Sequence, residues 1–229
     1  MRIPNPETSC SSCKSKCDIY FTAREMGLEH EIKPLHVRYE KHEVICRQNS
    51  PITLAIKLLE GNAKMFVEGL HGRNIILGIL MPENHIGMMS VFGSPVYTYH
   101  VSSLTDSLTC QTDIAFVHKL YYGNQSFMMR LNQAFGAAAA SIMQKLISLN
   151  QKQIRARVAE SLLYLSQLYQ APVFRLTITR KEMAELSGMT AENAVRVLSE
   201  FRKEGLIEIT GKQIHLIKPV ILERISLAG

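Results

Sequence analysis

The sequence predicts an α+β protein that combines an N-terminal β-roll, one long helix and a C-terminal winged helix-turn-helix. Three observations lead to this fold class. Short apolar segments separated by turn residues fill the first half of the chain, a sustained amphipathic pattern follows them, and the end of the chain has the pattern of two short helices and a hairpin. With 229 residues, of which 46% are hydrophobic and 20% charged, the chain is large enough to bury a core.

We expect the β-roll between residues 21 and 123, after an N-terminal segment of residues 1–20 that is rich in cysteine. Turn-forming Gly, Asn and Pro residues recur at the spacing of an antiparallel sandwich or barrel. The extended segments between them are Leu35 to Cys46, Ile52 to Leu59, Lys64 to Glu68, Asn74 to Leu80 and Tyr97 to Thr109.

A long helix is predicted over residues 124–150, because apolar residues recur there at steps of three and four. They are Phe127, Leu131, Phe135, Ala138, Ile142, Leu146 and Leu149. Four consecutive alanines in the middle of this helix would let a second backbone approach closely. The stripe favours a homodimer formed helix against helix, but packing on the chain's own β-roll explains it equally well.

Residues 151–229 have the pattern of a winged helix-turn-helix. Thr179 to Glu182 has the form of a capping box that begins a short helix, and Gly188 ends it. Thr190 is then placed as the N-cap of a second helix that runs to about Lys203. The second helix gathers Ala194, Val197, Leu198 and Phe201 on one side and Glu192, Arg196, Ser199 and Lys203 on the other. Two short segments joined at Gly211-Lys212 complete a wing.

This segment, from Leu176 to Ile217, resembles the DNA-binding domain of the CRP/FNR family of bacterial transcription regulators. The order of parts agrees with the family over nearly the whole chain. The resemblance implies a cyclic-nucleotide-binding-like jelly roll as sensor, the helix at 124–150 as dimerisation helix, and double-stranded DNA and RNA polymerase as partners. Since the chain has no motif of a hydrolase, kinase or dehydrogenase, we expect a regulator and not an enzyme.

The resemblance assigns base reading to Glu192 and Arg196, and implies a palindrome of the TTGA-like class. Arg can bind guanine O6 and N7, Glu can accept from cytosine N4, and Val195 between them can meet a thymine methyl. Without DNA, Glu192 and Arg196 could simply form a surface ion pair. The full predicted DNA-binding set is Thr179, Arg180, Lys181, Thr190, Glu192, Val195, Arg196 and Ser199.

Three cysteines, Cys10, Cys13 and Cys17, fall within eight residues, and such a loop can wrap a metal. Cys110 is the natural fourth ligand, because its distance along the chain from Cys17 matches the separation of the last two cluster ligands in FNR. Four thiolates suit a [4Fe-4S] cluster and also structural zinc. The loop between the second and third cysteines is shorter than in the best known FNR pattern. Cys110 could also be a buried apolar residue, and Cys46 is expected to be one. The three N-terminal cysteines could instead occur by chance in a disordered tail.

We therefore expect a regulator that senses oxygen or redox state through an iron-sulfur cluster. A nitric-oxide sensor with a cluster or heme, structural zinc, thiol redox sensing, and no metal with an unknown effector remain alternatives. A cyclic nucleotide is not expected, because Met88 and Met89 follow the β-roll glycine and the later strand offers no arginine for a phosphate. No apolar run approaches the roughly 20 residues of a membrane helix, and Met1 to Lys16 has no apolar signal core, so we expect a cytoplasmic protein.

Overall fold

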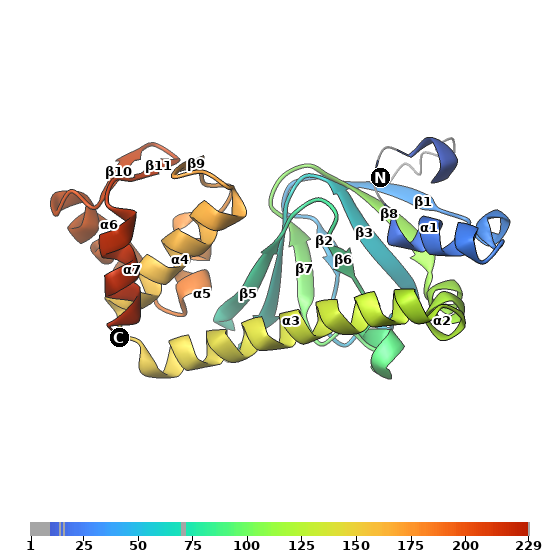
Figure 1. The fold of residues 1–229 in the computed structure, drawn as a ribbon. Helices are drawn as coiled ribbons and strands as arrows, with labels where there is room; N and C mark the ends of the chain where they lie inside the picture. The colour runs from blue at the N-terminus through green and yellow to red at the C-terminus, as the bar shows by residue number, and fades with distance from the viewer. Residues whose placement is uncertain (1–9, 14, 16, 70–71, 229) are drawn as a thin grey trace. The chain divides into compact units, whose positions relative to one another are not determined.

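The computed structural model describes residues 10–13, 15, 17–69 and 72–228 (Figure 1). The rest of the predicted N-terminal segment 1–20 lies outside the described residues. The chain divides into two compact units. The first contains the residues up to Val67 together with Gly78–Ala139, and the second contains Glu68–Leu77 together with the residues from Ala140 onward. The predicted α+β fold class is confirmed.

Two four-stranded sheets make up most of the first unit. One sheet has the order β1 (Leu35–Tyr39), β8 (Ser107–Asp113), β3 (Leu54–Glu60), β6 (His85–Ile86). The other has the order β2 (Val44–Cys46), β7 (His100–Ser103), β4 (Ala63–Glu68), β5 (Asn74–Leu80). Two predicted strands are each divided in the structure. The first is interrupted by a turn at Glu40–Glu43, where His42 has a positive φ of 70°, and the last by a turn at Thr105 and Asp106.

The β-roll core lies between the inward faces of its strands. It contains Val37, Ile56, Leu58, Ile86 and Val101, each at most 5% exposed. Because side chains alternate along a strand, the inward residues of β8 are Ser107, Thr109 and Gln111, and the Gln111 side chain donates to Tyr39 Oη at 2.9 Å. Leu108 and Cys110 therefore lie on the opposite, outer face of this sheet.

A second core of the same unit joins helices α1 (Asp18–Glu25), α2 (Ile114–Gly123) and the start of α3 (Gln125–Gln151). Its buried members include Ile19, Ala23, Val117, Leu120 and Phe127. Ala55 of β3 belongs to this core, which places α1 and α2 against the outer face of the first sheet (Figure 1). Neither α1 nor α2 was predicted, whereas the long helix at 124–150 is confirmed as α3.

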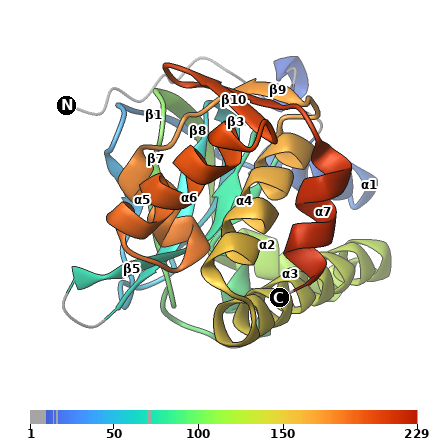
Figure 2. The same ribbon diagram turned by 90° about the vertical axis from the view of Figure 1, so that its left-hand side faces the viewer.

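The second unit is built around α4 (Ile154–Leu168), which packs against three other helices (Figure 2). They are α5 (Arg180–Ser187), α6 (Ala191–Lys203) and α7 (Pro219–Leu227). The predicted wing is confirmed as β10 (Ile207–Thr210) and β11 (Gln213–Leu216), and an unpredicted strand β9 (Val173–Arg175) pairs with β11. Within the described part of the chain, no helix has the length and apolar character needed to cross a bilayer.

Candidate functional site

The first helix of the helix-turn-helix, α5, begins with the predicted capping box. Thr179 Oγ1 accepts from the Glu182 backbone N–H at 3.1 Å, and the Glu182 carboxylate accepts from the Thr179 N–H at 2.7 Å. Two backbone donors at the helix start are thus satisfied by side chains. Glu182 is only 5% exposed, so this box is part of the packed domain and fixes the direction in which α5 starts.

The turn between α5 and α6 requires a glycine at position 188. Gly188 has a φ of 62°, a left-handed conformation in which a side chain is strained. Its carbonyl accepts from Arg157 Nη1 of α4 at 2.7 Å. A Cβ at this position would also collide with the Leu149 side chain. Conformation and lack of space therefore both favour glycine at this turn.

Helix α6 presents one face to the core and the opposite face to solvent, as predicted. Its buried residues are Ala194, Val197, Leu198 and Phe201, each at most 2% exposed. Thr190 is the N-cap and accepts from the Asn193 N–H at 3.4 Å. On the outer face, Glu192 and Arg196 are exposed, and Val195 is 49% exposed.

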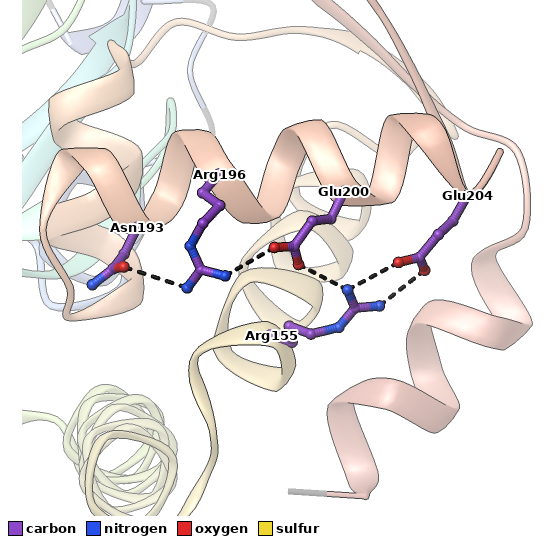
Figure 3. A network of polar contacts seen from close by, with 5 residues as sticks. All are labelled: Arg155, Asn193, Arg196, Glu200 and Glu204. Carbon is purple, nitrogen blue, oxygen red and sulfur yellow. Dashed lines mark hydrogen bonds and ion pairs between the residues drawn. The ribbon is translucent and has the colours of Figure 1, made fainter.

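Arg196 is held by its own helix through residues other than Glu192 (Figure 3). Its Nη1 lies 2.8 Å from Glu200 Oε1, and its Nη2 donates to Asn193 Oδ1 at 3.4 Å. The pKa of Glu192 is lowered by its own backbone N–H and by the Thr190 side chain. The alternative in which Glu192 and Arg196 pair with each other is therefore not what the structure contains, and Glu192 stays at the helix start.

Glu200 links Arg196 to helix α4. Its second oxygen accepts from Arg155 Nη1 at 2.8 Å, and Arg155 also binds Glu204 with two hydrogen bonds of 2.9 Å (Figure 3). The Arg155 guanidinium lies 5.0 Å from the centre of the Phe201 ring. These carboxylates raise the pKa of Arg155. The network was not predicted, because nothing along the chain shows that α4 passes beside the end of α6.

The remaining residues of the predicted DNA-binding set lie at the start of α5 and along α6. Lys181 has a side chain that is 75% exposed and lies 4.0 Å from Glu185. Arg180 is half-buried, and its Nη1 has no hydrogen-bond partner among the described residues. Ser199 is half-buried on α6, and Thr179 and Thr190 are exposed at the two helix starts. The eight residues therefore come from α5 and α6 and their caps.

The apolar stripe of α3 divides into two parts. Phe127 is 1% exposed and Leu131 packs against the same core, so the beginning of the stripe covers the chain's own first unit. Further along, Phe135, Ile142 and Leu146 are 37%, 40% and 55% exposed. Packing on the chain's own first unit thus holds for the beginning of the helix, and dimer formation stays a prediction for the rest. The second part leaves an apolar surface available for another chain.

The four predicted metal ligands lie in the first unit. Cys10 begins a short 3-10 helix (Cys10–Ser12), Cys17 is the N-cap of α1, and Cys110 is on the outer face of β8. All four are half-buried free thiols, while Cys46 is buried in the β-roll core as expected. The Cys17, Cys10 and Cys13 thiols each raise the pKa of the Cys110 thiol, so they lie near it. The chain thus brings its three N-terminal cysteines toward the fourth across about a hundred residues of sequence.

The chemistry of this donor set fits a metal centre. The pKa of the Cys10 thiol is raised to about 11 by burial and by the nearby Cys17 and Cys13 thiols. The pKa of Cys110 is raised to about 12 by burial and by the other three thiols, and Lys57 opposes this shift. The raised pKa values reflect the cost of forming several thiolates close together. A bound metal cation would offset that cost, since metals bind the thiolate form. Among the described residues, no three His, Cys, Asp or Glu side chains are grouped closely enough to hold a metal ion.

Two tyrosines, Tyr97 and Tyr99, lie beside Gly87 in the β-roll interior. Gly87 has a φ of 89°, and its N–H points to Tyr99 Oη at 3.4 Å. Tyr97 Oη donates to the Leu54 carbonyl at 3.4 Å. Burial raises the pKa of both phenols, which keeps them neutral. A neutral phenol at this glycine offers no positive charge to a phosphate.

Comparison with known proteins matches both units. Residues 36–121 match the cyclic nucleotide-binding domain family, and residues 156–225 match the Crp-like helix-turn-helix domain family. The transcriptional activator protein Anr of Pseudomonas aeruginosa is 26% identical over 98% of this chain and 94% of its own. The anaerobic regulatory protein of Pasteurella multocida is 21% identical over 95% and 82%. The structure of FixK2 from Bradyrhizobium japonicum, 19% identical, covers 86% of this chain and 98% of its own with a TM-score of 0.79.

A β-roll sensor domain followed by a long helix and a winged helix-turn-helix defines a class of DNA-binding transcription regulators. The chain belongs to the CRP/FNR family of these regulators. Its relatives are regulators of transcription and not enzymes, in agreement with the prediction from sequence.

Three polar residues beside the cysteines were missed from the sequence. Lys57 and Glu83 form an ion pair of 2.6 Å, and Ser15 donates to Glu83 at 2.8 Å. One signal was present: Lys57 interrupts an apolar strand of Ile56, Leu58 and their neighbours. A charged residue inside such a run is expected to have a partner, because an unpaired buried charge is costly.

Proposed function

We propose that this chain is a cytoplasmic, homodimeric regulator in which Cys10, Cys13, Cys17 and Cys110 hold a [4Fe-4S] cluster. The proposal is supported by the position of Cys110 on the outer face of β8 and by the effect of Cys17, Cys10 and Cys13, which all raise the pKa of its thiol and therefore lie near it. When bound, such a cluster supplies a centre that oxygen can dismantle. The anaerobic regulatory protein among the relatives supports this choice of signal.

Cys17 couples the cysteine site to the dimerisation helix. It is the N-cap of α1 and packs beside the core that α1 shares with α2 and the start of α3. Arg130 of α3 donates to Thr22 of α1 at 3.1 Å, and Asn124 just before α3 donates to Glu25 at 3.3 Å. A change in how Cys17 is held would therefore shift α1 and alter the support of α3. We infer that this route connects the signal to dimer formation.

The exposed part of α3, around Ile142 and Leu146, is the surface on which we propose the second chain packs. Two paired chains would present two α6 helices to one face of DNA, with half-sites about 34–36 Å apart on a palindrome. Glu192, Val195 and Arg196 form the exposed face of α6, and their chemistry suits a TTGA-like half-site. The relative described as a transcriptional activator supports RNA polymerase as a further partner.

Metal analysis and operator binding on the same preparation test this function. Protein purified without air should contain about four iron and four sulfide per chain, and should bind a TTGA-type palindrome more tightly than an air-exposed aliquot does. The Cys110→Ser variant should contain no cluster iron, and its operator affinity should be the same with and without exposure to air. Cys46→Ala is the matched control, since Cys46 is buried in the β-roll core away from the outer face, and it should keep both.

A colourless protein with one tightly bound zinc, purified without air, would contradict the iron-sulfur proposal. Equal operator affinity with and without air, for wild type and Cys110→Ser alike, would contradict the whole sensing mechanism. The family assignment would stand in both cases, because it depends on other residues.

A further inference from the structure

A row of polar side chains crosses the outer face of the β1-β8-β3-β6 sheet. Cys110 of β8 lies opposite Lys57 of β3 in the strand register, and Lys57 lies opposite His85 of β6. Cys110 also lies opposite His36 of β1. Directly opposed residues of antiparallel strands point to the same face, with Cβ atoms about 4.5–5.5 Å apart. Lys57 is therefore the cross-strand neighbour of the proposed fourth ligand, on the ligand's own side of the sheet.

Lys57 is a buried cation, only 3% exposed. Its Nζ lies 2.6 Å from Glu83 Oε2. The pairing offsets the cost of the buried ammonium, although the Glu83 side chain is itself 51% exposed. Such pairs add little to stability compared with apolar residues of similar size. Stability alone therefore gives no reason for a lysine at this position. A requirement for positive charge beside Cys110 would explain the lysine.

Glu83 connects this lysine to the segment that carries the other three cysteines. Its Oε1 accepts from Ser15 Oγ at 2.8 Å, and Ser15 lies between Cys13 and Cys17. One carboxylate thus contacts a residue opposite Cys110 and a residue inside the cysteine loop. A single side chain joins the two halves of the proposed ligand set.

The backbone of Glu83 has an unfavourable conformation. Its φ is 78°, in the left-handed region that residues with a side chain rarely adopt. The Glu83 N–H donates to the Leu58 carbonyl at 2.8 Å, and the Leu58 N–H donates to the Asn84 carbonyl at 3.0 Å. These bonds to β3 fix the turn beside Lys57. Backbone strain of this kind is concentrated at functional sites.

We propose that Lys57, Glu83 and Ser15 form an anchoring network for the four-cysteine centre, in which Lys57 supplies a buried counter-charge and Glu83 fixes both Lys57 and the cysteine loop. The inference rests on the proposed function, since it assumes that the cysteines bind a metal centre. Four thiolates around a zinc ion or a cluster leave a net negative charge. A buried ammonium one strand away offsets that charge far better than one in water, because the dielectric constant is lower there.

Lys57→Met is the primary test, because methionine keeps an unbranched chain and removes the charge. We expect Co²⁺ and Zn²⁺ to bind apo-protein 10- to 100-fold more weakly, roughly the effect of removing an outer-shell partner, and the reduction potential of the reconstituted cluster to become more negative. Lys57→Arg, which keeps the charge, should remain close to wild type in both measurements. Ser15→Ala should weaken metal binding through the loop while leaving Lys57 in place.

Lys64→Met is the matched control. Lys64 is on β4 of the other sheet, with its Nζ 5.0 Å from the centre of the Phe66 ring. The Lys64→Met substitution therefore also removes one positive charge from the first unit, but at a position away from the cysteines. The Lys64→Met variant should bind Co²⁺ and Zn²⁺ with the affinity of wild type. An equal loss in Lys64→Met would overturn the network, since net charge alone would then explain the effect.

The outcomes separate the network from the function on which it rests. If wild-type protein binds neither Co²⁺ nor a cluster, the proposed function fails. If wild type binds both and Lys57→Met binds with the same affinity and potential, the network is refuted and the four-cysteine centre stands. If circular dichroism shows that Lys57→Met is unfolded, the Ser15→Ala variant provides the test instead. Unchanged metal affinity in folded Ser15→Ala protein would refute the anchoring network.

Discussion

Arg196 is bonded to Glu200, one turn further along α6, with 2.8 Å between Nη1 and Oε1. Glu200 also accepts from Arg155 of α4. The arginine proposed to read DNA is therefore held by a carboxylate that is itself hydrogen-bonded to a second helix. To contact a base, Arg196 must exchange Glu200 for guanine. The exposed ion pair it gives up is worth only about 0.3–0.5 kcal/mol, and a bidentate guanine contact contributes more.

Arg196→Ala should therefore reduce discrimination at one base pair of each half-site by about 1–3 kcal/mol. The measurement is the affinity for the palindrome and for singly substituted palindromes at one fixed salt concentration. Arg202→Ala removes an equal charge from the exposed end of the same helix and should weaken all sequences alike. Uniform weakening by Arg196→Ala would show that it contacts phosphate only.

Gly188→Ala should lower the free energy of unfolding of the second unit by more than the cost of placing one alanine in a left-handed conformation. That conformation alone costs roughly 1–2 kcal/mol for a residue with a Cβ, and at Gly188 the new methyl group also meets Leu149. Gly205 is the matched control, because its φ is 66° but no atom lies within 4 Å of its Cβ position. Urea unfolding monitored by circular dichroism measures both variants. Equal losses would show that Leu149 moves aside freely.

The helix-turn-helix could be predicted from sequence because its information is local. Capping residues, a turn glycine and a period of 3.6 all act within one or two turns of helix, and the buried residues of α6 are the four that the pattern indicated. The helix α2 gave no such signal. Asp113 ends β8 and also caps α2, its carboxylate accepting from the Ala115 N–H at 2.7 Å, so no turn residue separates the strand from the helix.

The surroundings of the cysteines could not be predicted, because they depend on strand register. Sequence spacing suggested Cys110 as the fourth ligand, but that Lys57 lies opposite it follows only from how β3 pairs with β8. A shift of one residue would move Lys57 to the other face. The contact of Ser15 with Glu83 joins residues 68 positions apart. No local pattern encodes such a contact.

Leu146→Glu should weaken the proposed dimer, because it places a charge in the exposed apolar part of α3. Leu146 is 55% exposed in the single chain, so the substitution costs the monomer little, while a buried unpaired carboxylate is costly in an interface. We expect a dimer dissociation constant raised at least about tenfold, or about 1.4 kcal/mol, in sedimentation equilibrium. Gln133→Glu, at an exposed polar position of the same helix, should leave it unchanged. A dimer unaffected by Leu146→Glu would place the interface elsewhere.

Lys145 should make stability depend on pH in the alkaline range. Burial lowers the pKa of this lysine from 10.5 to about 8, although Glu160 favours its charged form. Between these two values the unfolded chain holds a proton that the folded chain has lost, so the free energy of unfolding should rise with pH from about 8 to 10.5 and fall as pH decreases through this range. The size of this contribution is on the order of 1–3 kcal/mol.

Lys145→Met should remove that slope and stabilise the protein at neutral pH, although it gives up the hydrogen bond from Lys145 to the Leu186 carbonyl. Urea unfolding of wild type and variant at several pH values from 7 to 10.5 gives the difference directly, so that groups titrating in both proteins cancel. Lys203→Met, at an exposed lysine at the end of α6, should retain the wild-type slope. A difference between wild type and Lys145→Met that is constant with pH would mean that Lys145 keeps its proton in the folded protein throughout this range.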